Sequence, residues 1–167
     1  MLSFGFPPIS SPAARILILG SLPGQLSLAL GQYYASPQNA FWRIMAARIP
    51  NLPPDYAGRV AALVEQRVAL WDVLAAATRS GSLDSAIEKD AIPNNFRAFF
   101  HAHPHIELIG FNGATAAKLY HRHVMPTLTD EQRVVAKQTL PSTSAAHASL
   151  SFVEKTDGWS VLWGGCA

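Results

Sequence analysis

Four short, largely apolar runs, separated by segments with helical spacing, constrain the fold of this chain most strongly. The runs are Arg15–Gly20, Val68–Leu74, Ile106–Phe111 and Arg133–Thr139. Short apolar runs bounded by turn residues are typical of strands buried on both faces, as in a parallel sheet. Strands that alternate with helices predict an α/β fold with helices on both faces of the sheet. We therefore expect a three-layer αβα arrangement around a four-stranded parallel sheet.

The segments between these runs carry apolar residues three or four positions apart, which is the spacing of an amphipathic helix. The predicted helices are Ala40–Arg48, Asp55–Arg67, a segment through Phe96 and Phe100 capped by Asn94, Ala114–His123, and a last helix from near Ala146 toward Trp163. We expect Ser21–Pro37 and Gly81–Pro93 to be loops. A chain of 167 residues fits one domain, here residues 1–167.

The composition is that of a folded chain, with 49% hydrophobic and only 14% charged residues. The formal net charge is +2 and the sequence pI is about 8.9. This balance permits nucleic-acid binding without arguing strongly for it. If the chain binds DNA, a local patch and main-chain N–H groups must make many of the phosphate contacts.

Cysteine usage and hydropathy exclude several other classes. The one cysteine, Cys166, cannot build a disulfide framework, an iron–sulfur cluster or a cysteine-based zinc site. The apolar run Ile16–Leu19 is far too short to span a bilayer, and the first residues lack the features of a secretory signal. We expect a cytoplasmic monomer without metal or cofactor.

Polar clusters follow three of the predicted strands, in the segments Ser21–Asn39, Asn112–Gly113 and Leu140–Ser144. Ligands of open parallel sheets bind outside the carboxyl ends of the strands. Because these three segments all leave a strand at that edge, the pattern predicts that they meet there and form a site.

Each cluster has a functional and a purely structural interpretation. Gly20–Gly24 can present free N–H groups to an anion, or it can be an ordinary turn after a strand. One ring of Tyr33 and Tyr34 can stack on a flat ligand, while the other fills the core. Asn39 can position a water molecule or cap the helix that follows it.

The later clusters are equally open on spacing alone. Asn112 can offer its amide to the edge of a base or simply form a turn with Gly113. The hydroxyls of Pro141–Ser144 suit phosphate contacts and also helix capping. The histidines of His101–His105 favour a solvated connector over a metal site. No G-x-S-x-G elbow occurs, and Asp72 and Asp84 are the nearest candidates for paired carboxylates.

Three stretches together resemble the uracil-DNA glycosylase superfamily, and in particular its hypoxanthine (deoxyinosine) DNA glycosylase family. They are Ile18-Leu-Gly-Ser-Leu-Pro-Gly24 with Tyr33-Tyr-Ala-Ser-Pro-Gln-Asn-Ala-Phe-Trp42, then Trp71-Asp-Val-Leu74 with Gly81-Ser-Leu-Asp-Ser85, then Phe111-Asn-Gly113 with Leu140-Pro-Ser-Thr-Ser144. Their order covers nearly the whole chain, and the stretch from Tyr33 to Trp42 is the most specific part.

The resemblance implies a monofunctional, metal-free glycosylase that hydrolyses the N-glycosidic bond of a flipped-out deaminated base, hypoxanthine or uracil, in base-excision repair. The catalytic duty falls on Asn39, because Leu22 stands where the mismatch-specific family has an asparagine. The implied base-binding residues are Gly20, Ser21, Leu22, Pro23, Gly24, Tyr34 and Asn112. The implied DNA-binding residues are Ser36, Gln38, Leu140, Pro141, Ser142, Thr143, Ser144 and His147.

The chain departs from the family pattern at two places. Ser36 stands where the family usually has histidine, and Ala145-Ala146-His147 stands where it usually has Pro-Ala-Asn. The first change bears on the pocket or a phosphate contact, and the second on the wedge that fills the space left by the base. Two alternatives therefore stay open: a mismatch-specific uracil/thymine DNA glycosylase, and a non-catalytic module that binds nucleotides or damaged DNA. An esterase-like hydrolase ranks last.

Overall fold

The computed structural model describes residues 2–79, 82, 87 and 90–164, and its centre is a parallel sheet of four strands. In spatial order the strands are β3 (Val68–Asp72), β2 (Ile16–Gly20), β6 (Leu108–Asn112) and β7 (Ala136–Leu140). All three neighbouring pairs are parallel, and Gly20 at the end of β2 lies beside Asp72 at the end of β3. The four predicted strands are thus confirmed, with ends that agree or differ by up to three residues.

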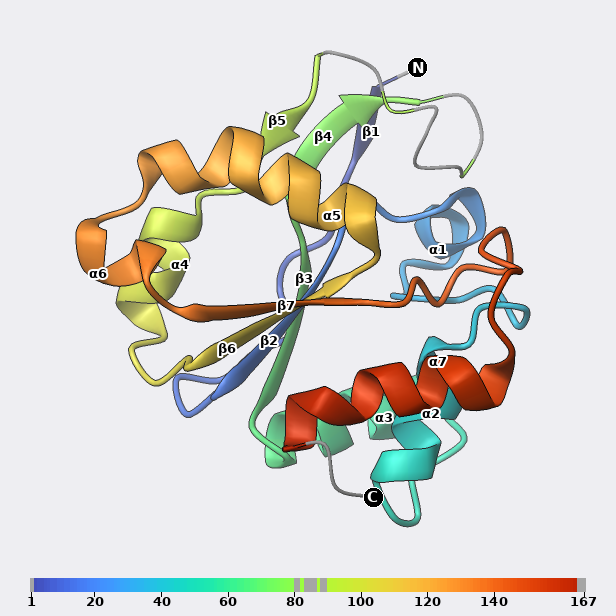
Figure 1. The fold of residues 1–167 in the computed structure, drawn as a ribbon. Helices are drawn as coiled ribbons and strands as arrows, with labels where there is room; N and C mark the ends of the chain where they lie inside the picture. Colours follow the sequence, from blue (N-terminus) through green and yellow to red (C-terminus); the bar gives the residue numbers. More distant parts are fainter. Residues whose placement is uncertain (1, 80–81, 83–86, 88–89, 165–167) are drawn as a thin grey trace.

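Helices cover both faces of this sheet, which confirms the expected three-layer arrangement (Figure 1). On one face lie α4 (Phe96–Ala102) and α5 (Ala114–Leu119). On the other lie α2 (Phe41–Arg48), α3 (Tyr56–Glu65) and α7 (Phe152–Trp159). In the part of the chain that is described, no helix is both long enough and apolar enough to cross a membrane.

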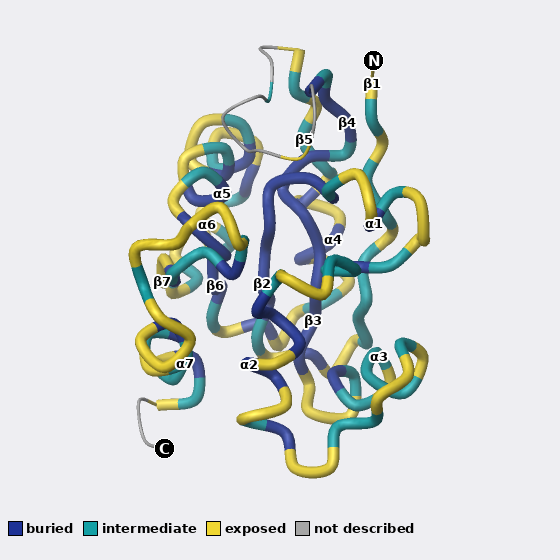
Figure 2. Tube along the Cα trace, turned by 90° about the vertical axis from the view of Figure 1, so that its right-hand side faces the viewer, coloured by how far each residue is buried: buried dark blue, intermediate teal, exposed yellow. Residues whose placement is uncertain are grey.

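The core consists of the sheet and the aromatic side chains packed on it. Figure 2 shows β2 and β3 buried along their length, with the exposed segments on the outer helices and loops. Phe96 of α4 contacts Trp71 of β3 at a ring distance of 4.9 Å, and Phe41 of α2 contacts Trp159 of α7 at 5.9 Å. Burying one such ring contributes about 1.5–3 kcal/mol, so this packing holds the strand ends in place.

The predicted strand Val68–Leu74 is in fact two strands in two sheets. β3 ends at Asp72, and β4 (Leu74–Thr78) joins an antiparallel sheet with β1 (Leu2–Phe4) and β5 (Ile92–Pro93). The break occurs at Val73, whose amide N–H donates to the carbonyl of Gly20 at 2.8 Å. An apolar run gives no sign of such a change of partner, because both strands are buried.

The predicted loop Ser21–Pro37 contains a helix, α1 (Gln25–Leu30), that the sequence did not reveal. Gly24 precedes it, and Gly31 ends it in the left-handed conformation at φ 65°. Six residues complete less than two turns, so no apolar periodicity could be recognised. Most of the predicted loop Gly81–Pro93 lies outside the described residues.

Three short elements connect α5 to β7. The helix predicted over Ala114–His123 continues after α5 as a π-helical turn, η2 (Tyr120–Val124), and a 3₁₀ turn, η3 (Met125–Thr127). Next comes α6 (Asp130–Arg133), which Thr129 and Gln132 cap reciprocally. The final 3₁₀ turn, η4 (Ser160–Trp163), follows α7.

Two predicted helix starts were wrong. Asn95, and not Asn94, caps α4 by accepting the amide of Ala98, while the side chain of Asn94 donates to the carbonyl of Asp72 at 2.8 Å. The last helix begins at Phe152 and not near Ala146, because Ser151 and Glu154 form a capping box. The residues between Ser144 and Ser151 are therefore turns at the sheet edge.

Candidate active site

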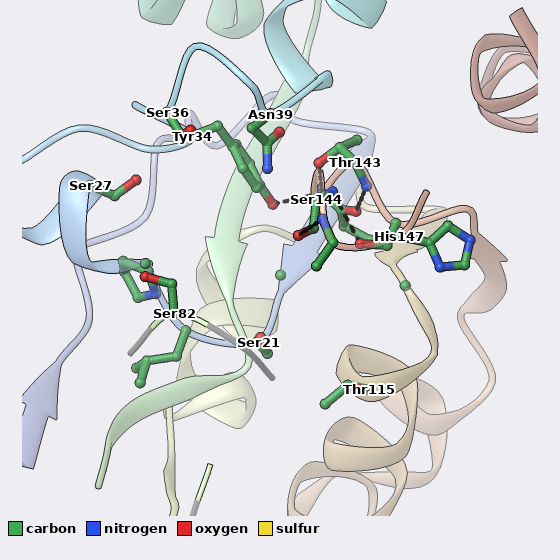
Figure 3. A pocket seen from close by; sticks show the side chains of 18 of the residues that line it. Ser21, Ser27, Tyr34, Ser36, Asn39, Ser82, Thr115, Thr143, Ser144 and His147 are labelled. Carbon is green, nitrogen blue, oxygen red and sulfur yellow. Dashed lines mark hydrogen bonds between the residues drawn. The ribbon is translucent and has the colours of Figure 1, made fainter. Parts of the chain in front are cut away.

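A cavity of about 750 Å³ lies at the carboxyl edge of the four-stranded sheet (Figure 3). Its wall comes mainly from the segments after β2, β6 and β7, which confirms that the three polar clusters meet. Every residue predicted to act on a base or on DNA lines this cavity, except Gln38, which is exposed outside it. Ser27, Ser82 and Thr115 also line it and were not predicted as site residues, and so does Asp72, which the sequence offered only as a candidate carboxylate.

Asn112 at the end of β6 ties two of these segments together. Its amide nitrogen donates to the hydroxyl of Tyr34 at 3.1 Å and to the hydroxyl of Thr143 at 2.9 Å. Its amide oxygen accepts the main-chain N–H of Thr143 at 2.9 Å. Both amide hydrogens are thus engaged within the protein, and the side chain is only 7% exposed. Asn112 therefore holds the side chain of Tyr34 and the turn at Thr143 in place relative to the end of β6 in this structure.

Tyr34 lies on the cavity wall, and contacts to its ring and to its hydroxyl fix the position of its side chain. The ring stacks on Phe41 with centroids 4.2 Å apart, and the hydroxyl accepts the hydrogen bond from Asn112. Its backbone adopts a left-handed conformation at φ 52°, which costs a residue with a Cβ about 1–2 kcal/mol. Such strain is found where the surrounding contacts determine a side chain's direction.

Tyr33 belongs to the core, although it also borders the cavity. It is 4% exposed, and its hydroxyl donates to the carbonyl of Pro7 at 2.9 Å. Burial raises the pKa of its phenol well above the ordinary value, and the nearby Asp72 adds to the shift. One of the two adjacent tyrosines thus fills the core, as predicted, and Tyr34 is the more exposed of the two at the cavity.

Asn39 is half-buried in the cavity wall just before α2. Its side-chain oxygen accepts the N–H of Phe41, the first residue of α2, at 2.9 Å, but the N-cap position itself is Ala40, so Asn39 is not the N-cap that the structural interpretation expected. The side chain also lines the cavity and points toward Tyr34 (Figure 3). The bond to Phe41 leaves the side chain able to contact a ligand, because the oxygen has a second lone pair and the amide nitrogen has two hydrogens.

Gly20 brings β2 unusually close to an acidic side chain on the cavity floor. A Cβ at this position would lie 2.5 Å from Oδ1 of Asp72 and 2.9 Å from the hydroxyl of Tyr34. Only glycine leaves room for both groups. Asp72 is 4% exposed and lines the cavity, which places a carboxylate among the groups that a ligand would meet. Asp84, the other predicted carboxylate candidate, lies outside the described residues.

The segment after β7 is supported from beneath by buried residues. Leu140 is 2% exposed and Thr143 is 1% exposed, so their side chains face the protein more than the cavity. The carbonyl of Thr143 accepts the amide of Ala40 at 2.9 Å, next to Asn39. These contacts place the hydroxyl groups of Ser142 and Ser144 at the mouth, where each also accepts a main-chain N–H two residues later.

Helix α7 braces the same segment. Trp159 donates to the carbonyl of Pro141 at 2.8 Å, and the ammonium of Lys155 donates to the carbonyl of Ser144 at 3.1 Å. Burial lowers the pKa of Lys155, and the nearby guanidinium of Arg43 lowers it further. His147 remains exposed at the outer end of the segment. The rim of the cavity thus ends in exposed polar groups on a braced turn.

The histidine tract is not part of the site. The ring of His103 stacks on Phe99 with centroids 3.9 Å apart and makes hydrogen bonds with the carbonyl of Phe99 and the hydroxyl of Ser10. Among the described residues, no group of three or more histidine, cysteine, aspartate or glutamate side chains is arranged to hold a metal ion.

The fold and the cavity agree with the uracil DNA glycosylase superfamily, whose model matches residues 7–160. The match covers most of the chain, and the chain belongs to this superfamily. It is 33% identical over 158 residues to a hypoxanthine DNA glycosylase of Methanosarcina barkeri, covering 93% of this chain and 94% of that protein.

Two further relatives come from Methanosarcina acetivorans. A hypoxanthine DNA glycosylase is 36% identical over 165 residues, covering 98% of this chain and 99% of that protein. The solution NMR structure of a protein provisionally named a uracil DNA glycosylase matches with a TM-score of 0.80 and 35% identity, covering 99% of both chains. Sequence and fold therefore point to the same family over nearly the whole chain.

Proposed function

We propose that this protein is a monofunctional DNA glycosylase that hydrolyses the N-glycosidic bond of a deaminated base, hypoxanthine or uracil, in DNA. The observation that carries the proposal is the cavity in which the amide of Asn39, the ring of Tyr34 and the main chain of Gly20–Gly24 line one space. The names of the Methanosarcina relatives support this substrate class.

The target base must leave the duplex to enter such a cavity, since its glycosidic bond is inaccessible within the stack. Base flipping costs a few kcal/mol, and stacking on an aromatic ring returns roughly 1–3 kcal/mol. Tyr34 is suited to this role, because Phe41 supports its ring and the bond from Asn112 holds its hydroxyl. These contacts hold the ring in place before the base arrives.

Asn39 orients the attacking water. The N–H of Phe41 identifies which end of the carboxamide is the oxygen and holds it in place. The second lone pair of that oxygen can accept a hydrogen bond from water and direct it toward C1′. An amide is too weak a base to remove the proton early, so its contribution is orientation, which can be worth several kcal/mol.

The leaving base takes the electron pair of the C1′–N bond and carries negative charge until it gains a proton. Main-chain N–H groups in Ser21–Gly24 are the nearest candidates to stabilise this charge, and one such donor is typically worth roughly 3 kcal/mol. The water oxygen bonds to C1′ and releases its proton to solvent. None of the described residues that line the cavity is a lysine, which supports hydrolysis without a Schiff-base step.

DNA contacts are assigned to the exposed rim. Ser36, Gln38, Ser142, Ser144 and His147 provide hydroxyl, amide and imidazole groups for phosphates and for the space left by the flipped base. Pro141 precedes Ser142 on the same turn, which α7 supports through Trp159. Leu140 and Thr143 act in this scheme by supporting that turn from below, in keeping with their burial.

The test is an excision panel of duplex oligonucleotides, each carrying one hypoxanthine, uracil, thymine or xanthine. We expect release of free hypoxanthine or uracil and an abasic strand that is cut only after alkali treatment. Release confined to mismatched thymine or uracil would favour the mismatch-specific alternative. Stoichiometric binding without free base would replace the proposal by a non-catalytic DNA-binding module.

A further inference from the structure

Arg79 is a buried cation directly behind the Gly20–Gly24 turn, and no step proposed above uses it. It follows the last residue of β4, and its backbone pairs with Ile87 in an isolated antiparallel bridge. The side chain is 6% exposed. A buried guanidinium is costly unless hydrogen bonds satisfy it, so the partners of Arg79 indicate what it does.

Two of those partners are consecutive carbonyl groups of the turn. One terminal nitrogen of Arg79 donates to the carbonyl of Leu22 at 3.4 Å, and the other donates to the carbonyl of Pro23. Charge-assisted bonds of this kind are stronger than neutral ones, and the planar fork fixes the direction of both carbonyls. Arg79 itself does not line the cavity, whereas Leu22, Pro23 and Gly24 do.

Because a peptide unit is planar and trans, these bonds also determine the direction of an N–H group on the other side of the turn. Within one peptide unit the C=O and the N–H point in opposite directions. The Leu22–Pro23 unit has no N–H, so the relevant unit is Pro23–Gly24. With the carbonyl of Pro23 drawn toward Arg79, the N–H of Gly24 points away from Arg79.

The next amide along the chain is engaged elsewhere. The N–H of Gln25 donates to the hydroxyl of Ser82 at 2.8 Å. Hydrogen bonds in series polarise one another, so a cation on the carbonyl of Pro23 makes the N–H of Gly24 a stronger donor. Pro23 has no N–H, and the N–H of Gln25 is bonded to Ser82, so the N–H of Gly24 is the donor that Arg79 can influence.

We propose that Arg79 is a positioning residue that aims and strengthens the Gly24 N–H as a donor to the departing base. This inference rests on the proposed glycosylase activity, because it assigns that donor to the negative charge on the leaving group. Arg79 acts from behind the turn and never contacts the base. Its loss should matter most when the leaving base holds negative charge poorly.

The test compares single-turnover release of uracil and 5-fluorouracil by wild type, Arg79→Gln and Arg79→Lys. The fluorinated base is the more acidic leaving group and needs less stabilisation. We expect Arg79→Gln to lose about tenfold or more with uracil and clearly less with 5-fluorouracil. Lysine keeps the charge but lacks the fork, so Arg79→Lys should lie between the two. DNA affinity should stay within about twofold of wild type, since phosphate contacts are elsewhere.

Arg59→Gln is the matched control. Arg59 also donates to a proline carbonyl, that of Pro53, but on α3 and away from the cavity. Its loss should leave both rates unchanged. An equal fractional loss on the two bases by Arg79→Gln would reduce Arg79 to a structural role and overturn the inference.

The free protein gives a second measurement that needs no turnover. In the NMR spectrum, Arg79→Gln should move the Gly24 amide proton upfield, as expected for a weaker donor, while the thermal transition stays cooperative. An unchanged Gly24 resonance would also overturn the inference. If wild type releases none of hypoxanthine, uracil and 5-fluorouracil, the proposed function fails on its own, and the Gly24 resonance still shows whether Arg79 polarises the turn.

Discussion

The two ends of the four-stranded sheet carry polar side chains of very different character. At the carboxyl end, Asn112 and Thr143 are buried and bonded to each other beside a cavity of about 750 Å³. At the amino end, a hollow of about 380 Å³ is lined by Ala13, Arg15, Arg67, His105 and Glu107. There the ion pair of Arg15 and Glu107, 2.9 Å apart, has side chains 50% and 60% exposed.

This contrast separates a prearranged site from a solvated surface. Buried polar groups are costly unless every partner is present, so the carboxyl end is rigid and sensitive to single atoms. Exposed ion pairs exchange partners with water and contribute little. Substitutions at the two ends should therefore differ in the size and in the kind of their effects on excision and stability.

The largest effect is expected from Asn39→Ala, which removes the amide that orients water. Single-turnover excision should fall at least roughly 100-fold, because orientation alone can be worth several kcal/mol. Binding to DNA that contains the base should persist, measured by fluorescence anisotropy. Excision at the wild-type rate by this variant would remove Asn39 from the mechanism.

Gly20→Ala should come next. Its Cβ would lie 2.5 Å from Asp72 and 2.9 Å from the Tyr34 hydroxyl, so one of these groups must move. We expect excision to fall by roughly 10-fold or more, since small misplacements in a site cost rate.

Gly31→Ala is the matched control for Gly20→Ala. Gly31 has φ 65°, but a Cβ added there would meet nothing within 4 Å, so this variant should lower the melting temperature and leave the excision rate unchanged. Equal activity losses in the two variants would contradict the steric explanation.

Tyr34→Ala should lose stacking energy of roughly 1–3 kcal/mol, seen as weaker binding of the extruded base and slower excision. Tyr34→Phe keeps the ring on Phe41 and loses only the hydroxyl bonded to Asn112. It should therefore be the milder variant in a titration with DNA that carries the base. A phenylalanine variant as impaired as the alanine variant would mean that the hydroxyl, and not the ring, is what matters.

The smallest effect is expected at the amino end, from Arg15→Met. Arg15 lowers the pKa of Glu107 through a hydrogen bond and its charge. A carboxyl with a lowered pKa adds stability above its ordinary pKa, and that stability is lost as the pH falls through the folded-state value. In Arg15→Met the pKa of Glu107, followed by NMR titration, should rise toward the ordinary value with excision unchanged. A pKa that stays low would contradict the pairing.

Local patterns were sufficient for much of this molecule. The apolar runs located the strands of the main sheet, and the strand-ending clusters located the edge at which they meet. The adjacent Tyr33 and Tyr34 also predicted that one of the two rings fills the core, as Tyr33 does. These features depend on hydrophobic periodicity and on the direction of a strand, and the order of neighbouring residues determines both.

Other features had no local signal. Asn112 was predicted to contact the edge of a base, and no local pattern showed that its amide hydrogens also bond to Tyr34 and Thr143, residues 78 and 31 positions away. Val73 marks a change of sheet inside one apolar run, and Arg79 lies behind a turn more than fifty residues earlier in the chain. In each case the partner is distant in sequence, so only packing could reveal it.

The amino-acid sequence alone determined the layers, the parallel sheet and the edge that carries the polar clusters, since buried strands and helices follow from the order of apolar residues. The tertiary structure decided which polar atoms pair at that edge. Buried polar atoms need hydrogen-bond partners, and at this edge the partners come from segments far apart in the chain. The residues of one segment alone therefore do not indicate which atoms will pair.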